Sequence, residues 1–219
     1  MFKKWWLGFI LSLFFAIPVQ AFTISPTKYL ITVDPGDAQT IDVKIKNEER
    51  IDHNFKILVG GLQQNSQGVL IFEQGTVVAE DWVKPEKDKM FLRAGATASA
   101  SFLLNIPKDL PSGSYFLGLA VETADSVDKN VNALNGRLFS ILILRVAGEA
   151  REVLSIEKWI GDNRLTWNAD WPLTLEIKNN GNIDIPIRGE IEILSGIEKS
   201  KVIEWKMGDN LLVGAVRDL

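Results

Sequence analysis

The chain has 219 residues, a formal charge of −4 and no cysteine. Hydrophobic residues make up 46% of it, which is enough for a packed core and excludes a wholly disordered chain. The acidic balance argues against a nucleic-acid partner, which requires a basic face, and the lack of cysteine excludes thiol enzymes and cysteine-ligated zinc sites.

The first 21 residues have the three parts of a secretory signal peptide. Lys3 and Lys4 form a positively charged N-terminal region, residues 5–17 are an uncharged apolar run, and a small residue, Ala21, ends the segment. We predict export and cleavage between Ala21 and Phe22, which leaves 22 basic and 28 acidic residues (24 − 2 = 22) and a net charge of −6. The alternative is an uncleaved anchor, but the run is shorter than the ~20 residues that span a bilayer. Membrane attachment would otherwise require a segment not present here, because no second apolar stretch is long enough.

After this segment, apolar and polar residues alternate with a period of two, which indicates half-buried β-strands. Turn-forming glycines and prolines separate such runs, which occupy residues 41–46, 55–59, 97–104 and 115–121. Residues 138–146 are almost wholly apolar, which predicts a strand covered on both faces. The pattern predicts an all-β fold, with an immunoglobulin-like Greek-key β-sandwich over residues 22–148.

The sequence also repeats itself after 132 positions. Residues 43–47 (Val-Lys-Ile-Lys-Asn) match residues 175–179 (Leu-Glu-Ile-Lys-Asn), and Asp52 matches Asp184. The match predicts a second immunoglobulin-like sandwich in tandem, residues 149–219. The counterparts of the last strands of the first copy are missing, so we expect this second domain to be incomplete. Either the sequence is a fragment, which we favour, or the second domain is a smaller variant, or a partner supplies the missing strands.

The order of several short elements in the first domain resembles a known family. These are residues 22–26 (Phe-Thr-Ile-Ser-Pro), the turn 34–36 (Asp-Pro-Gly), a strand that ends in Lys-Asn at 46–47, and residues 106–115 (Ile-Pro-Lys-Asp-Leu-Pro-Ser-Gly-Ser-Tyr). Together they resemble bacterial extracytoplasmic Ig-like domains of the pilus-chaperone type, including those of WxL-interacting cell-surface proteins. The tyrosine at the end of the last segment is similar to the one that begins a central strand at a sandwich corner. The resemblance implies protein–protein contact at the bacterial envelope.

Pilus chaperones hold the C-terminal carboxylate of a subunit with two basic residues and offer the subunit a strand edge. By position, the resemblance assigns the two basic roles to Lys28 and Arg145. A periplasmic pilus-type chaperone is therefore one of the functions that the sequence allows.

The sequence offers little for catalysis. Its one histidine, His53, lies in a polar turn and is expected to be exposed, and no phosphate loop, zinc motif or EF-hand spacing occurs. We expect no cofactor, no metal and no enzymatic activity, although a glycosidase would need only carboxylates.

Four tryptophans follow residue 150 and leave a second function open. Trp159 and Trp205 lie in strand-like runs and are expected in the core, whereas Trp167 and Trp171 flank a predicted loop. Exposed aromatic rings can stack on sugars, so the alternative is a carbohydrate- or cell-wall-binding module. The other interpretation is that Trp167 and Trp171 pack between the domains.

The leading hypothesis is an exported, non-enzymatic protein of the bacterial envelope or extracellular space that acts as a structural or protein-interaction module. We expect it to lie outside the cell, on the cell surface or in the periplasm. Its expected partner is another envelope or surface protein, with polysaccharide as the alternative and no nucleic acid.

Overall fold

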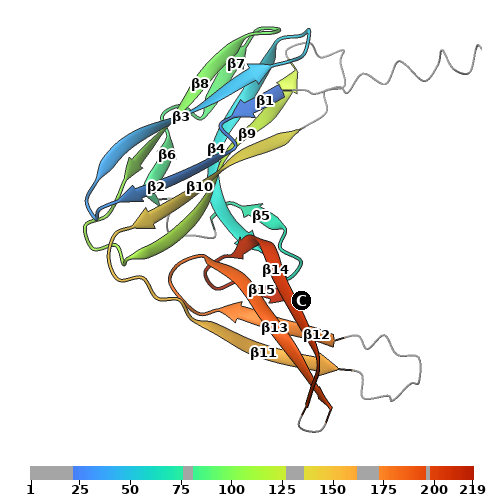
Figure 1. Cartoon of the computed structure of the whole chain (residues 1–219). Helices are drawn as coiled ribbons and strands as arrows, with labels where there is room; N and C mark the ends of the chain where they lie inside the picture. The colour runs from blue at the N-terminus through green and yellow to red at the C-terminus, as the bar shows by residue number, and fades with distance from the viewer. Residues whose placement is uncertain (1–21, 76–80, 127–135, 162–172, 196–197) are drawn as a thin grey trace, which may run out of the picture.

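A computed structural model describes residues 22–75, 81–126, 136–161, 173–195 and 198–219, which form β-strands joined by turns (Figure 1). The predicted leader and Ala21 lie outside the described residues, so export and cleavage stay predictions. A helix able to cross a membrane does not occur in the described part of the chain. Figure 1 shows two stacked units, one built from β1 to β10 and the other from β11 to β15.

The first unit is a sandwich of two sheets, as the alternation predicts. One sheet has the order β1 (Phe22–Ser25), β3 (Ala38–Asn47), β8 (Thr97–Asn105) and β6 (Val83–Pro85). The other has the order β2 (Lys28–Val33), β10 (Arg137–Val146), β9 (Gly113–Ser126), β4 (His53–Gln64) and β5 (Leu70–Glu73), and β7 (Lys89–Leu92) also pairs with β4. The chain changes sheets between β1 and β2, since β1 pairs with β3 and β2 runs parallel to β10.

The core of this unit follows from the period-two pattern. Ile41, Val43 and Ile45 of β3 are buried, while the residues between them are exposed. They join Phe102 of the neighbouring strand β8 and Phe55 of the facing sheet in one continuous apolar cluster. Both phenylalanines are fully buried, and replacing either with alanine would cost about 3–5 kcal/mol.

The predicted sandwich corner is confirmed. The hydroxyl of Tyr115 donates to the carbonyl of Pro111 at 2.9 Å, four residues upstream. This bond fixes the entry of β9 into the sheet.

The second unit has a three-stranded and a two-stranded sheet. The first has the order β11 (Leu154–Gly161), β12 (Leu173–Asn179) and β15 (Val216–Asp218), and the second pairs β13 (Ile185–Ser195) with β14 (Glu198–Leu211). The registers repeat those of the first unit. Phe22 pairs with Asn47 and Leu154 pairs with Asn179, so both members of the pair shift by 132 positions.

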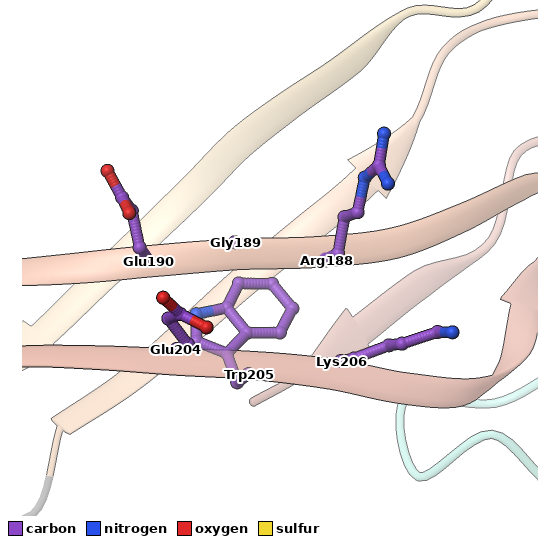
Figure 2. A pocket seen from close by; sticks show the side chains of 6 residues that line it. All are labelled: Arg188, Gly189, Glu190, Glu204, Trp205 and Lys206. Atoms are coloured by element: carbon purple, nitrogen blue, oxygen red, sulfur yellow. The ribbon is translucent and has the colours of Figure 1, made fainter.

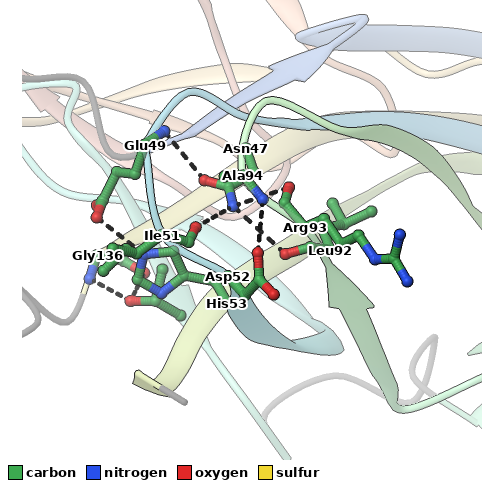
Figure 3. A network of polar contacts seen from close by, with 10 residues as sticks. Asn47, Glu49, Ile51, Asp52, His53, Leu92, Arg93, Ala94 and Gly136 are labelled. Atoms are coloured by element: carbon green, nitrogen blue, oxygen red, sulfur yellow. Dashed lines mark hydrogen bonds and ion pairs between the residues drawn. The ribbon is translucent and has the colours of Figure 1, made fainter. Parts of the chain in front are cut away.

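An asparagine at the end of β3 carries a hydrogen-bond network (Figure 3). Asn47 is fully buried, and its side-chain Nδ2 donates to the carbonyls of Ile51 at 2.8 Å and Leu92 at 3.4 Å. Its Oδ1 accepts the backbone N–H of Glu49 at 3.0 Å. The amide thus joins the end of β3, the following turn and the end of β7.

Asn179 does the same at the end of β12. Its Nδ2 donates to the carbonyls of Ile183 at 2.8 Å and Leu211 at 3.0 Å, and its Oδ1 accepts the N–H of Gly181 at 2.9 Å. The spacing from each asparagine to its partners in the turn is the same in both units. The repeat in the sequence therefore matches a repeat in backbone pairing and side-chain bonding, while the division into two tandem domains stays a proposal.

The expectation of an exposed histidine is wrong. His53 is only 1% exposed, because it opens β4 instead of lying in the turn. Its Nε2 lies 2.8 Å from a carboxylate oxygen of Glu49, and its ring is tilted against Phe55 (Figure 3).

The two units share a second apolar cluster at their junction. Leu62, Phe116 and Ile143 of the first unit pack with Ile187 and Leu211 of the second. The side chains of β10 therefore alternate between the sandwich core and this junction, which confirms the prediction of a strand covered on both faces.

Candidate binding site at the open edge of β10 and the cleft between the units

The first residues of β10 present an unpaired backbone edge. β2 pairs with β10 only from Ile141 onward, and the Ile141 N–H donates to the carbonyl of Thr27 at 2.9 Å. Alternate residues of a strand direct their N–H and C=O groups to the same side. The backbone groups of Arg137 and Phe139 therefore face this same edge, and no strand in the described ranges pairs with it there.

A groove of about 430 Å³ runs between this edge and β1. Phe22 and Ile24 of β1 line one side, and Leu138 and Phe139 of β10 line the other. Leu138 is 40% exposed, which makes it an accessible apolar contact within the groove.

An aromatic stack supports the opposite face of the edge. The rings of Phe139 and Phe72 stack with 5.8 Å between their centroids, and the guanidinium of Arg137 lies 5.1 Å from the Phe72 ring. The paired glycines Gly60 and Gly118 make room for Phe72, since a Cβ at either would come within 2.7 and 2.5 Å of that ring.

A cleft of about 390 Å³ lies where the two units meet. Lys28 of β2 lines one wall, and Asp184 and Asp209 of the second unit line the other. The exposed Lys28 forms no ion pair within the described ranges. It is therefore a cation placed at the end of the open edge of β10, where β2 begins.

Arg145 has a different environment. It donates to Asp184 across the junction at 3.1 Å, and Asn210 donates to the other carboxylate oxygen of Asp184 at 2.6 Å. Burial raises the pKa of Asp184, but the hydrogen bonds from Asn210 and Arg145 and the charge of Arg145 outweigh it and hold that pKa below its ordinary value. Arg145 and Asp184 thus link the two units by an ion pair.

The structure does not bring the two basic residues assigned by resemblance together. Lys28 lies opposite Ile141, and Arg145 is four residues further along β10, or about 13 Å at the usual rise of a strand. A shared hold on one carboxylate stays a prediction, and Arg145 already has a carboxylate partner in Asp184.

A second ion pair lies at the junction, within the second unit. Arg217 of β15 is buried and donates to Asp209 at 2.7 Å, and this bond and the charge of Arg217 hold the pKa of Asp209 below its ordinary value despite some burial. The Arg217 guanidinium lies directly against Gly68 of the first unit, where a Cβ would come within 2.3 Å of it. Asp209 lies within β14.

The other candidate residues contribute less to this site. Trp167 and Trp171 lie outside the described residues, so the sugar-binding alternative has no described geometry. Trp159 is 57% exposed, so its expected place in the core is wrong, whereas Trp205 (Figure 2) is partly buried against the junction cluster. The described ranges contain no group of three or more acidic or histidine side chains arranged to hold a metal ion.

Comparison with known proteins by sequence finds no match to a family model and none to a curated protein. Comparison of structures does find similar folds. The class 5 fimbriae chaperone CfaA is 15% identical with a TM-score of 0.54, and the match covers 89% of this chain and 83% of CfaA.

Two similar chains come from complexes. One is in the CsuC–CsuE chaperone–tip adhesion subunit pre-assembly complex of Acinetobacter baumannii, at 16% identity and a TM-score of 0.50, with 91% of this chain and 90% of that chain covered. The other is in the complex of Salmonella enterica SafA pilin with the SafB chaperone, at 11% identity and 0.50, with 93% and 85% covered. At these identities the likeness shows the fold alone, which is the Ig-like β-sandwich fold of pilus chaperones.

Proposed function

We propose that this chain is an exported, non-enzymatic interaction module of the bacterial envelope that holds an extended segment of another surface protein. In this proposal it consists of two tandem Ig-like units and acts in the manner of a fimbrial chaperone. The bound segment adds as a strand to the open edge of β10. The function is binding, and it needs neither cofactor nor metal.

The single observation that carries the proposal is the unpaired edge at Arg137 and Phe139 beside an apolar groove. An added strand would hydrogen-bond to these backbone groups, which gives affinity independent of sequence. Its alternate side chains would enter the groove beside Leu138 or lie over Phe139 and Phe72, which selects an apolar alternating segment.

Lys28 indicates how the bound segment ends. Because Thr27 already pairs with Ile141, an added strand cannot continue past the start of β2. The exposed ammonium of Lys28 at this point favours an acidic residue or a terminal carboxylate.

The unbound protein offers a first test by residue-resolved amide exchange. The amides of Arg137 and Phe139 face the open edge and should exchange fast, whereas those of Leu138 and Ser140 face β9 and should be protected. Equal protection of all four amides would contradict the open edge.

Binding is then tested with a phage-displayed library of random 12-residue peptides selected on the immobilised protein. Selected peptides should alternate apolar residues and should slow the exchange of the Phe139 amide. Leu138→Asp should abolish their binding, while Leu103→Asp serves as the matched control, because Leu103 is equally exposed (39% against 40%) but lies in the other sheet. Peptides that bind both variants equally would refute the proposed site.

A further inference from the structure

The strand β2 ends its sheet and has a free edge. It pairs with β10 on one side (Figure 1), and no strand in the described ranges pairs with its other side. The carbonyls of Thr27 and Val33 face β10, where they accept from the N–H groups of Ile141 and Ala147. The backbone groups of successive residues alternate between the two sides of a strand. Those that face the free edge therefore belong to Lys28, Leu30 and Thr32.

Leu30 makes the middle of this edge apolar. Its side chain is 56% exposed and lies opposite Ile143 of β10, which is buried in the junction cluster. Leu30 thus extends that cluster to the free edge. Prolines, bulges and charges usually protect a strand edge. β2 has no proline, its register with β10 is continuous, and its one charge, Lys28, lies at its first residue.

The alternation limits how β2 can pair with a copy of itself. An antiparallel two-fold pair must be centred on a residue that faces the free edge, which is Lys28, Leu30 or Thr32. A centre at Lys28 places two ammonium groups opposite each other, which is destabilising. A centre at Thr32 places the apolar Leu30 opposite Asp34. Only a centre at Leu30 pairs leucine with leucine and leaves no like charges opposed.

We infer that β2 joins β2 of a second copy of this chain in an antiparallel, two-fold pair centred on Leu30. Leu30 then exchanges both backbone hydrogen bonds with Leu30 of the partner subunit, and Lys28 does so with Thr32 of the partner subunit. The interface is self-complementary, as a two-fold dimer requires. It is separate from the strand-accepting edge at Arg137 and Phe139, so it does not rest on the proposed function.

Both faces of β2 continue across this pair. On the outer face, the side chain of Leu30 meets its own copy. On the inner face, Tyr29 lies opposite Ile31 of the partner subunit. Tyr29 and Ile31 are only half-buried in one chain, where they pack against the sandwich core. An aromatic side chain opposite a β-branched one is a favourable cross-strand pair, and burial of the three side chains adds an apolar contribution.

The charges at the ends of β2 are complementary in the same register. Lys28 and Asp34 are exposed, and neither forms an ion pair within the described ranges. In the pair, Lys28 lies opposite Thr32 of the partner subunit and diagonal to Asp34 of the partner subunit. Diagonal neighbours in a sheet are within reach of a long side chain. The two-fold symmetry repeats this contact at the other end of the interface.

Sedimentation equilibrium of the purified chain tests the dimer. The unchanged chain should dimerise reversibly, and Leu30→Asp should weaken dimerisation by about tenfold or more, because it places two carboxylates opposite each other at the axis. Leu30→Pro should weaken it as much, since it removes an N–H that has no partner within one chain. Leu103→Asp is the matched control, because Leu103 is also exposed but lies in the other sheet. Equal urea midpoints show that the variants fold.

The result that overturns the inference is equally clear. A chain that stays monomeric up to about 1 mM contradicts it. So does a dimer that withstands both Leu30→Asp and Leu30→Pro. Neither outcome affects the proposed function, which depends on peptide binding at β10.

Exchange of charges tests the ends of the interface. Asp34→Lys should weaken dimerisation several-fold, because it places a second ammonium group near Lys28 of the partner subunit. The double variant Lys28→Asp/Asp34→Lys should restore it. A double variant that dimerises no better than Asp34→Lys contradicts this register.

The register is also tested by cross-linking, because the chain has no cysteine of its own. Leu30→Cys alone should form a disulfide-linked dimer on mild oxidation, since opposed residues of this kind lie about 5.5 Å apart at Cα, within the range of a disulfide. Lys28→Cys mixed with Thr32→Cys should also cross-link, whereas either of these two variants alone should do so far less. Equal cross-linking in all four samples would refute a pair centred on Leu30.

Discussion

Replacing Asn179 with alanine should destabilise the protein by about 4 kcal/mol. The change removes three hydrogen bonds, which leaves the carbonyls of Ile183 and Leu211 and the N–H of Gly181 without their partner. The Leu211 carbonyl is buried, and such an unpaired group costs about 1–3 kcal/mol, while the two part-buried groups cost about 1 kcal/mol each. The loss is large against the about 5–15 kcal/mol that stabilise a typical domain.

The assay is urea unfolding followed by circular dichroism, compared at equal m-values. Asn47→Ala should cost a similar amount, about 4 kcal/mol, because its longer bond to Leu92, at 3.4 Å, is supplemented by one to the carbonyl of Arg93 at 3.2 Å. Asn180→Ala is the matched control, since that side chain is exposed and its one bond, to Ser155, is exposed as well. A cost below about 0.5 kcal/mol at Asn179, or an equal cost at Asn180, would show that the amide network does not hold the strand ends together.

Two further predictions concern the junction and the site. The pKa of Asp184 is lower in the folded protein than in the unfolded chain, so its pairing with Arg145 and Asn210 stabilises the fold above the ordinary pKa of an aspartate. This stabilisation is lost as the pH falls below about 4. The midpoint of urea unfolding should therefore decrease below that pH, and it should decrease less in Asp184→Asn. Gly118→Ala places a Cβ 2.5 Å from the Phe72 ring and should cost about 1–3 kcal/mol by thermal unfolding while weakening selected-peptide binding, because the stack beneath Phe139 must shift.

Much of the fold could be predicted from the sequence because it depends on local alternation. Ile41, Val43 and Ile45 are buried as expected, and Tyr115 lies at the start of a central strand, at the expected sandwich corner. The continuous apolar run 138–146 correctly predicted a strand covered on both faces from Ser140 onward, although Leu138 at its start is 40% exposed. In each case, the pattern within one segment is a direct consequence of what covers its two faces.

Other features depend on long-range contacts that no local pattern reveals. Trp159 lies in a strand-like run, yet it is 57% exposed, where it lines a hollow between β11 and β13. His53 lies among polar residues, yet it is buried because Glu49 folds back over it from the turn. The polar context predicted that His53 is exposed, but its hydrogen bond to Glu49 and its packing against Phe55 place the ring in the interior.

The candidate site could also be predicted only in part. The resemblance identified Lys28, which does line the cleft, but it could not show that Arg145 is engaged by Asp184. The repeat aligns Asp184 with Asp52, whose carboxylate accepts the backbone N–H of Ala94, within the same unit, at 2.9 Å. Asp52 and Asp184 therefore have different roles although they are equivalent in the repeat, because Asp184 faces the other unit and Asp52 does not.

The open edge of β10 has a local origin, because β2 pairs with β10 only from Ile141 onward. A backbone edge costs free energy only where it is buried without partners, so the edge at Arg137 and Phe139 must remain in water or accept a strand. Backbone hydrogen bonds alone accept any sequence, so they cannot select a partner. The apolar groove beside Leu138 and the exposed ammonium of Lys28 supply that selection, and together they favour an apolar alternating segment that ends in a negative charge.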